Sequence, residues 1–330
     1  MCTAISFKTK NHFFGRTLDH EVSFGESILI APKNYELSFR KITPIKNHFA
    51  ILGVGIEKEG YPLFFEATNE CGLSMAGLNF PGNACYYEWA NDKYNVTPFE
   101  LIPWILAQCA SVKEAIELLK RSNIVNIPFS ASMPLSPLHW FLADRERSVT
   151  VETLKKGMYI YDNTVGVLTN NPPFDYQMFA LNQFINVSAS SPETKFAPNL
   201  ALDEYSRGMG AIGLPGDLSS GSRFVRAVYT KENSICGDGE MESVSQFFHI
   251  MGSVAQTRGS VVLNNDQYEI TQYTSCYNTD LQKLYITTYE NSEICCVDLH
   301  KNNIKGKNLL QFKIPKRQSI QIIKLHKKII

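Results

Sequence analysis

The second residue of the chain, Cys2, carries a side chain whose type and position could do covalent chemistry. If Met1 is removed, Cys2 becomes the N-terminus and holds a thiol and a free α-amino group on one residue. Reference pKa values are about 8.5 for the thiol and about 7.7–8.0 for the amine, so both groups are reactive near neutral pH. A nucleophile and a general base then share one residue, without a histidine. A cysteine at position 2 is usually incidental, so other residues must support this interpretation.

Residues that could assist this thiol can be sought by their chemistry. A terminal amine that acts as a base needs a carboxylate to orient it, and Asp19 follows the second strand expected in the chain. Arg16, at the end of that strand, could hold a positive charge beside the thiol and favour the thiolate. An oxyanion needs rigid neutral donors, and Asn79 and Asn170 each end an expected strand. Such an Asn is usually turn chemistry, and spacing alone does not establish that these residues meet.

Other catalytic motifs are excluded by their context or are not found. Residues 208–213 match G-x-G-x-x-G, but polar residues precede them and Leu-Pro-Gly follows, which blocks the helix of a dinucleotide-binding turn. We therefore expect a glycine loop there. The seven histidines show no H-E-x-x-H pair and no cysteine at zinc spacing, and no G-x-S-x-G elbow occurs. Cys2 is thus the nucleophile candidate, and we expect neither a metal ion nor an organic cofactor.

The composition bounds the class of protein. The chain has 330 residues, 44% of them hydrophobic, which suffices for the core of one large domain or two small ones. Its formal net charge of zero gives no electrostatic reason to bind nucleic acid. Residues 301–330 hold nine Lys or Arg and no Asp or Glu. We interpret this segment as a solvated or frayed basic tail rather than a membrane-binding patch.

The N-terminal segment lacks the pattern of a signal peptide, because Lys8, Lys10, Asn11 and His12 interrupt any apolar run. No stretch reaches the roughly 18 continuous apolar residues of a membrane span. The eight cysteines show no C-x-x-C spacing, so we expect reduced, mostly buried thiols. These observations favour a cytoplasmic protein that does not contact a membrane.

The apolar pattern predicts the elements that position these residues. Strands are expected at residues 2–8, 12–16, 27–31, 49–56, 63–67 and 73–80. Capping boxes at 97–100 and 111–114 predict two helices after them. Further strands are expected at 138–143, 148–154, 158–161 and 165–169, helices at 176–185, 222–231 and 240–256, and strands at 268–275, 283–289 and 293–299. These blocks favour one domain of two packed sheets with helices outside, and not alternating βαβ units.

Five segments in a fixed order carry a resemblance to a known family. They are residues 1–4 (MCTA), 14–19 (FGRTLD), 76–82 (AGLNFPG), 166–172 (GVLTNNP) and 213–224 (GLPGDLSSGSRF). Together they resemble the choloylglycine hydrolase family, which contains the bile salt hydrolases and penicillin V acylases of gut bacteria. The resemblance runs from Cys2 to about residue 300 and implies an N-terminal-nucleophile hydrolase, an α+β fold of four αββα layers with two antiparallel sheets. We assign no role to the tail beyond about residue 305, which does not resemble the family well.

The resemblance also implies catalytic roles for six polar residues. They are the nucleophile and base Cys2, the amine-binding Asp19, the arginines Arg16 and Arg223, and the oxyanion residues Asn79 and Asn170. The residue at position 79 also bears on the substrate, because bile salt hydrolases resemble this sequence there whereas penicillin V acylases tend to carry Tyr.

Five apolar residues are expected by resemblance to line a pocket for a steroid, although ordinary core packing is the alternative for each. They are Leu18, Phe24, Phe65, Phe129 and Met133. The resemblance also implies a homotetramer.

The function expected from this resemblance is hydrolysis of the amide bond between a bile acid and glycine or taurine, so that the substrates are conjugated bile salts. Two alternatives stay open. One is a penicillin V acylase of the same family, which shares the chemistry. The other is a non-catalytic binding protein on the same scaffold, with Met1 retained.

Overall fold

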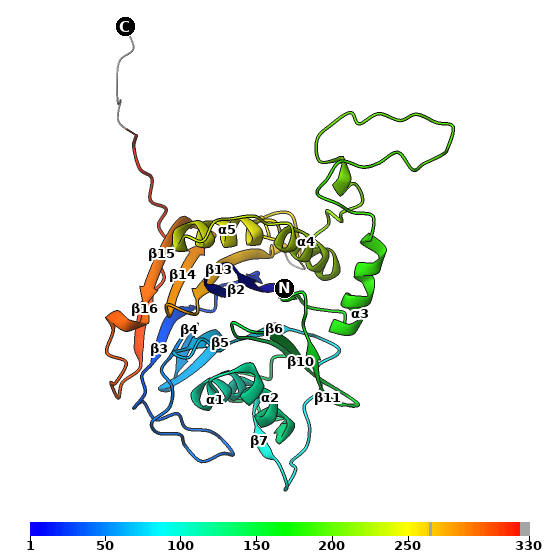
Figure 1. The fold of residues 1–330 in the computed structure, drawn as a ribbon. Helices are drawn as coiled ribbons and strands as arrows, with labels where there is room; N and C mark the ends of the chain where they lie inside the picture. Colours follow the sequence, from blue (N-terminus) through cyan, green and yellow to red (C-terminus); the bar gives the residue numbers. More distant parts are fainter. Residues whose placement is uncertain (264–265, 324–330) are drawn as a thin grey trace.

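The strands of the chain form two large antiparallel sheets (Figure 1). The structure is a computed structural model that describes residues 1–263 and 266–323. The strands of the first sheet are β1 Cys2–Lys8, β2 His12–His20, β12 Val167–Leu168, β13 Ile270–Asn278, β14 Lys283–Thr288 and β15 Asn291–Asp298. Their order is β12-β1-β2-β13-β14-β15, so β1 is an interior strand with partners on both sides.

The second sheet has eight strands. They are β3 Ser27–Ala31, β4 Ile51–Lys58, β5 Tyr61–Asn69, β6 Ser74–Asn79, β9 Leu138–Ala143, β10 Ser148–Leu154, β11 Gly157–Asp162 and β16 Leu310–Lys313. Their order is β11-β10-β9-β6-β5-β4-β3-β16. A small parallel pair, which the sequence patterns did not predict, joins β7 Tyr94–Val96 to β8 Ser122–Ile124.

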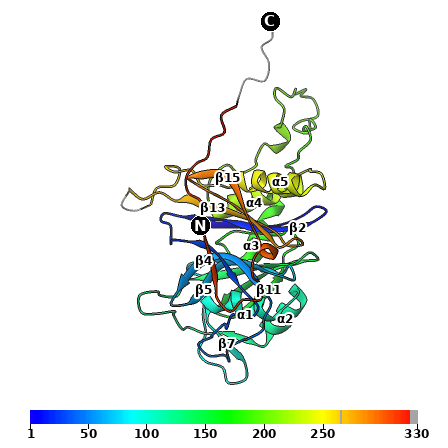
Figure 2. The same cartoon turned by 90° about the vertical axis from the view of Figure 1, so that its left-hand side faces the viewer.

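Helices cover the outer face of each sheet. Below the eight-stranded sheet lie α1 Leu101–Gln108 and α2 Val112–Lys120, and above the six-stranded sheet lie α4 Ser220–Glu232 and α5 Glu240–Gly252 (Figures 1 and 2). A further helix, α3 Phe174–Ala180, lies at the side of the sandwich. The prediction of four αββα layers built on two antiparallel sheets is therefore confirmed.

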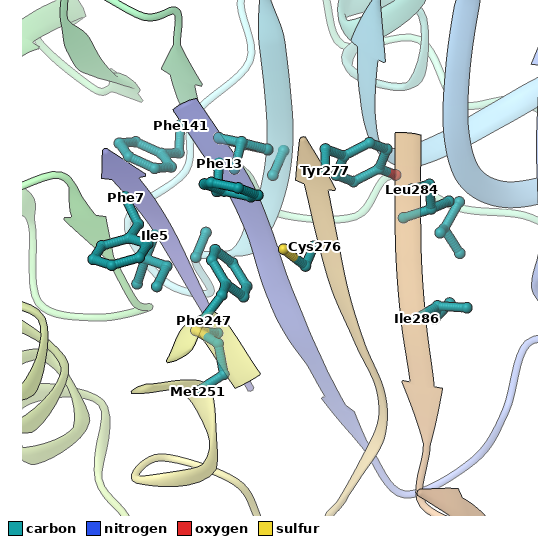
Figure 3. Close-up of a cluster of buried hydrophobic side chains, with 14 of the residues drawn as sticks. Ile5, Phe7, Phe13, Phe141, Phe247, Met251, Cys276, Tyr277, Leu284 and Ile286 are labelled. Atoms are coloured by element: carbon teal, nitrogen blue, oxygen red, sulfur yellow. The ribbon is translucent and has the colours of Figure 1, made fainter. Parts of the chain in front are cut away.

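The core is buried on both faces of the sheets, because each sheet packs on its neighbour inside and on helices outside. Phe14 of β2 stacks on Phe141 of β9 with ring centroids 5.5 Å apart, which joins the two sheets. The preceding residue, Phe13, belongs to the same buried cluster as Phe247 of α5 (Figure 3). Between Phe14 and Arg16 only glycine fits, since a Cβ on Gly15 would lie 2.0 Å from the Ser275 carbonyl oxygen. Such close packing fixes the β1–β2 hairpin between the layers that cover it.

The interpretation of residues 301–330 as a solvated tail is wrong for the part that forms β16. This strand pairs antiparallel with β3, with Leu310 opposite Ile30, and Ile314 just beyond it is buried in the core. Apolar residues at 310, 312 and 314 alternate with Gln311 and Lys313, a period-2 pattern typical of a half-buried strand. The strand covers an edge of β3 that would otherwise expose unpaired backbone groups. Residues 324–330 of the basic segment lie outside the described residues.

Three smaller expectations also have outcomes. Residues 208–213 form a loop with a short 3₁₀ turn, and Gly208 and Gly213 take positive φ values of 83° and 99°. The prediction of a glycine loop is confirmed. All eight cysteines are free, but the expectation that most of them are buried is wrong, because only Cys2, Cys109 and Cys276 are buried. In the described ranges, no helix combines the length and apolar character needed to cross a membrane.

Candidate active site

Cys2 is the first residue of β1, and the β1–β2 hairpin brings Arg16 and Asp19 to it. The register places Cys2 opposite Leu18 and Ala4 opposite Arg16. Residues two apart on a strand share a face, so Arg16 and Leu18 flank Cys2 on the same side of the hairpin. One guanidinium nitrogen of Arg16, Nη2, donates a hydrogen bond to the Cys2 sulfur. Cys2 itself is buried, with 4% of its surface exposed.

The guanidinium of Arg16 is held rigidly although it is fully buried. Its Nη1 donates to the carbonyl oxygen of Gly77 at 2.7 Å and its Nε to that of Thr17 at 3.2 Å. Burial alone would lower the pKa of Arg16, but the Cys2 thiol, Tyr273 and Glu66 together outweigh that effect and raise it. Arg16 is therefore a permanent cation in contact with the sulfur, an arrangement that favours a thiolate nucleophile.

Asp19 lies at the end of β2, beneath the beginning of the chain. Its carboxylate accepts hydrogen bonds from the hydroxyls of Thr271 at 2.7 Å and Thr17 at 3.0 Å. The ammonium group of Met1 donates to the backbone oxygen of Asp19 at 2.5 Å and forms an ion pair with Glu269. In this form the Cys2 nitrogen is a peptide amide and cannot accept a proton, so the structure shows the chain before any removal of Met1.

Asn170, which follows β12, connects three parts of the site. Its Oδ1 accepts hydrogen bonds from the Cys2 nitrogen and from Arg223 Nη2, both at 2.8 Å. Its Nδ2 donates to the backbone oxygen of Asn79 at 2.7 Å, and its own backbone nitrogen donates to Ser220 Oγ at 2.8 Å. The Asn170 amide therefore holds the Cys2 nitrogen in a fixed position beside the end of β6. Asn79 is exposed there.

Arg223, in the first turn of α4, is fully buried and ties the helix to the start of β1. Its Nη1 donates to the Cys2 carbonyl oxygen and to Thr3 Oγ1, both at 2.7 Å, and lies 3.8 Å from Asp19 Oδ2. Burial lowers the pKa of Arg223, and the neighbouring Asp19 and Cys2 oppose that effect. Arg223 thus fixes the backbone of the nucleophile and balances the charge of Asp19.

A cavity of about 300 Å³ opens beside Cys2 and is mainly lined by apolar side chains. All five apolar residues expected from the sequence line it, and Phe24 packs edge-on against Phe65 with ring centroids 5.7 Å apart. Further apolar residues of the lining, which the sequence did not single out, include Ile56, Phe99, Ile102 and Leu135. The polar groups of Arg16, Asp19 and Asn79 reach the same cavity. An apolar pocket with a few convergent polar groups is typical of a small-molecule site.

The six polar residues named from the sequence therefore lie together, although their catalytic roles stay predictions. Reasoning from the sequence missed Glu269, Thr271 and Ser220, which hold Met1, Asp19 and Asn170. No local motif marks Glu269 or Thr271, because their neighbours in the fold are distant in sequence, whereas Ser220 lies inside segment 213–224 but was not singled out. The strand expected at residues 268–275 was a partial signal for one of them. It contains Thr271, which the pairing of β13 with β2 brings opposite Asp19. In the described part of the chain, no three His, Cys, Asp or Glu side chains cluster as metal ligands would.

Comparisons with known proteins agree with this geometry. The model of the family described as linear amide C–N hydrolases, choloylglycine hydrolase family, matches residues 2–312. A bile salt hydrolase/transferase of Lactiplantibacillus plantarum is 50% identical over 312 residues, covering 94% of this chain and 96% of that protein. A bile salt hydrolase/transferase of Clostridium perfringens is 37% identical over 326 residues, covering 97% of this chain and 99% of that protein.

Solved structures show the same fold. A mutant of the conjugated bile acid hydrolase from Clostridium perfringens matches with a TM-score of 0.91 at 36% identity, over 98% of this chain and 100% of that one. The penicillin V acylase from Agrobacterium tumefaciens matches with a TM-score of 0.74 at 16% identity, over 95% of this chain and 91% of that one, which shows the fold alone. On the family model and these relatives, the chain belongs to the choloylglycine hydrolase family of linear amide C–N hydrolases.

Proposed function

We propose that this chain is a bile salt hydrolase that cleaves the amide between a bile acid and glycine or taurine, with Cys2 as its nucleophile. The observation that carries the proposal is the buried Cys2 sulfur in contact with Arg16 at the edge of a mainly apolar cavity. Relatives at 50% and 37% identity are named bile salt hydrolase/transferase, which supports the substrate class.

Removal of Met1 is the first requirement of this mechanism. It turns the Cys2 nitrogen from an amide into an amine, which can then take the thiol proton. Asn170 Oδ1 accepts from this nitrogen at 2.8 Å and keeps the amine beside the sulfur. We assign Asp19, whose backbone nitrogen donates to the Met1 carbonyl oxygen at 2.9 Å, to bind the same amine. Loss of Met1 also removes the ammonium group that pairs with Glu269, so that Glu269 can attract the α-amino group of Cys2 instead.

Chemistry at the substrate then follows in two steps. The Cys2 sulfur attacks the amide carbonyl carbon, and the protonated α-amine gives its proton to the leaving nitrogen as the C–N bond breaks. This step releases glycine or taurine and leaves a thioester on Cys2. Water, deprotonated by the same amine, hydrolyses the thioester and frees the bile acid. An amine in place of water would give acyl transfer, and the names of the relatives also include the word transferase.

The negative charge that develops on the carbonyl oxygen needs donors that are already in position. Asn79 lies at the cavity with its side chain exposed, and Asn170 Nδ2 lies next to it, 2.7 Å from the Asn79 backbone oxygen. We assign the oxyanion site to these two amides. Because Asn170 is held at four points by Cys2, Arg223, Asn79 and Ser220, its reorganisation during the reaction is small.

The steroid is assigned to the cavity. Burial of apolar surface is worth about 25 cal/mol per Å² before the costs of binding are subtracted. The side chains of Phe24, Phe65, Phe129 and Met133 offer that surface along the lining. A steroid fits such a lining better than the single phenyl ring in the acyl group of penicillin V, which favours the bile salt over that alternative.

The cellular compartment and the subunit assembly complete the proposal. The free state of all eight cysteines supports a reducing compartment such as the cytoplasm. The resemblance implies a homotetramer, and subunit contacts of some kind are supported by the long segment between α3 and α4, which projects from the body of the molecule (Figure 1). This segment exposes several large apolar side chains, as a surface for subunit contacts does. They include Phe196, Leu200, Tyr205 and Ile212. Light scattering of the purified protein would contradict this assembly if it gave the mass of a monomer.

The test of the function is a side-by-side hydrolysis assay of glycocholate, taurocholate and penicillin V, with intact mass measured on the same sample. We expect the mass of a chain without Met1 and kcat/KM at least about tenfold higher for a bile salt than for penicillin V, some 1.4 kcal/mol in the transition state. Faster cleavage of penicillin V would replace the assignment by an acylase. A retained Met1 with no turnover of any amide would indicate a non-catalytic binding protein.

A further inference from the structure

Glu66, on β5, is a buried carboxyl group that the mechanism above does not use. Its side chain is 0% exposed. Its Oε2 accepts a hydrogen bond from the Tyr273 hydroxyl at 2.8 Å, whereas its Oε1 is buried and has no hydrogen-bond partner among the described residues. A buried carboxylate with an unpartnered oxygen is poorly stabilised in its charged form. The surroundings of Glu66 therefore favour the neutral acid unless a nearby cation compensates.

The nearest cation is Arg16, and it faces two acids at once. Its Nη1 lies 3.8 Å from Glu66 Oε2, while its Nη2 donates to the Cys2 sulfur. Arg16 is only 1% exposed, so bulk water and salt screen neither interaction effectively. The carboxyl group of Glu66 and the thiol of Cys2 thus lie on two sides of one buried guanidinium.

The charge balance of the site makes these two acids competitors. Arg223 is already balanced by Asp19, 3.8 Å away. A thiolate on Cys2 balances Arg16, so an ionised Glu66 would add one negative charge in excess. Two acids that share one cation titrate as a coupled pair, and ionisation of one disfavours ionisation of the other.

The remaining groups that face Glu66 do not supply a second cation. From β13 come the hydroxyls of Tyr273, Ser275 and Tyr277, of which Tyr277 donates to the Glu66 backbone oxygen at 3.4 Å. From the loop before β3 comes Glu26, a further negative charge. Burial raises the pKa of Glu66 to about 7, with a smaller raising effect from Glu26, against the opposing effects of Arg16 and of the Tyr273 and Ser275 hydroxyls. Glu66 thus changes its charge near neutral pH.

We propose that Glu66 is a positioning residue that competes with the Cys2 thiolate for the charge of Arg16, an inference that rests on the proposed function of Cys2. When Glu66 is protonated, the guanidinium acts on the sulfur alone and the thiolate is stabilised. When Glu66 ionises, part of that stabilisation is withdrawn. Glu66 therefore limits the reactivity of Cys2 as the pH rises through neutrality.

The experiment compares wild type with Glu66→Gln, which keeps the shape of the side chain and removes its charge. Two rates are measured from about pH 5.5 to about pH 8. One is kcat/KM for glycocholate, and the other is alkylation of Cys2 by iodoacetamide, followed by mass spectrometry of the N-terminal peptide. We expect equal rates at the acidic end and a variant at least about fivefold faster at the basic end, because a buried charge a few ångströms away shifts an ionisation strongly.

Two further variants make the test specific. Tyr273→Phe removes a hydrogen bond that favours the charged form of Glu66, so the fall in reactivity should move to higher pH. Glu100→Gln changes another buried carboxyl group, whose contacts are the backbone nitrogens of Arg40 and Thr97, and should leave the pH profile unchanged.

The proposal is overturned if the rates of Glu66→Gln divided by those of wild type give the same ratio at every pH, whether above or below one. A purely structural role would change the rates equally at all pH values. If Glu66→Gln does not fold, an unshifted profile of Tyr273→Phe overturns it instead. The alkylation rates do not depend on turnover. Failure to hydrolyse any bile salt would therefore refute the proposed function, while the inference about Glu66 would still be decided by the labelling.

Discussion

Replacement of Asn170 by Ala tests how the site holds both its nucleophile and its oxyanion. The change removes an acceptor shared by the Cys2 nitrogen and Arg223 Nη2, and a donor next to Asn79. Loss of one oxyanion donor lowers kcat by about 10²–10³ in other hydrolases, and we expect a loss of this size here. Two donors, one of them charged, also lose their acceptor. At about 1–3 kcal/mol for each, the free energy of unfolding should fall by about 2–4 kcal/mol, since water from the cavity compensates in part.

The assay measures kcat and KM for glycocholate, together with the free energy of unfolding from urea titration. Asn171→Ala is the matched control, because its side chain contacts Pro81 and Asn83 and not the nucleophile. We expect near wild-type kcat for that control. A change confined to KM in Asn170→Ala would identify Asn170 as a substrate-binding residue and refute the oxyanion assignment.

Three further predictions follow from the site and the core. A variant blocked from losing Met1 should fold normally and lack activity, because the Cys2 amide cannot take the thiol proton; full activity in protein shown by mass to keep Met1 would contradict the mechanism. Asn79→Tyr should narrow the preference for bile salts over penicillin V, measured as the ratio of kcat/KM values, and an unchanged ratio would show that size at position 79 does not decide the substrate. Burial lowers the pKa of His12 to about 4, against the raising effect of Asp280. As the pH falls, His12 is therefore protonated in the unfolded chain before it is protonated in the folded protein. The free energy of unfolding should decrease as the pH is lowered from about 6.5 to about 4. In urea unfolding at several pH values, His12→Gln should reduce this dependence of the free energy of unfolding on pH. An equal pH dependence in the variant and wild type would show that His12 is not its source.

Much of the secondary structure could be predicted from the sequence because its signals are local. The capping box at residues 111–114 predicts the start of α2, and Ser111 Oγ indeed accepts from the Glu114 nitrogen at 3.3 Å. The ends of helices and strands were predicted less accurately. Strand β2 runs to His20, beyond the expected end at Arg16, because pairing with both β1 and β13 extends it. The strand β16 was missed because the basic composition of residues 301–330 as a whole concealed a short alternating pattern.

Part of the candidate site also follows from local reasoning. A hairpin between residues 2–8 and 12–16 brings Arg16 close to Cys2, since the strands are adjacent in the chain and their turn sets the register. Arg223 could be named only by resemblance, and Asn170 was a candidate oxyanion donor whose contact with Cys2 could not be derived from spacing. They reach Cys2 from distances of 168 and 221 residues along the chain, and no spacing rule predicts such contacts.

The sequence by itself determined the nucleophile candidate, the strands that carry it and the family of the chain, because these depend on residue type and on short-range pattern. Only the tertiary structure decided which carboxyl groups share the site. Asp19 lies beneath the chain terminus, Glu269 pairs with the Met1 ammonium, and Glu66 lies behind Arg16. The charge balance around a buried thiol depends on separations of a few ångströms between groups from different strands. Such separations arise when the two sheets pack together, and a one-dimensional pattern does not contain them.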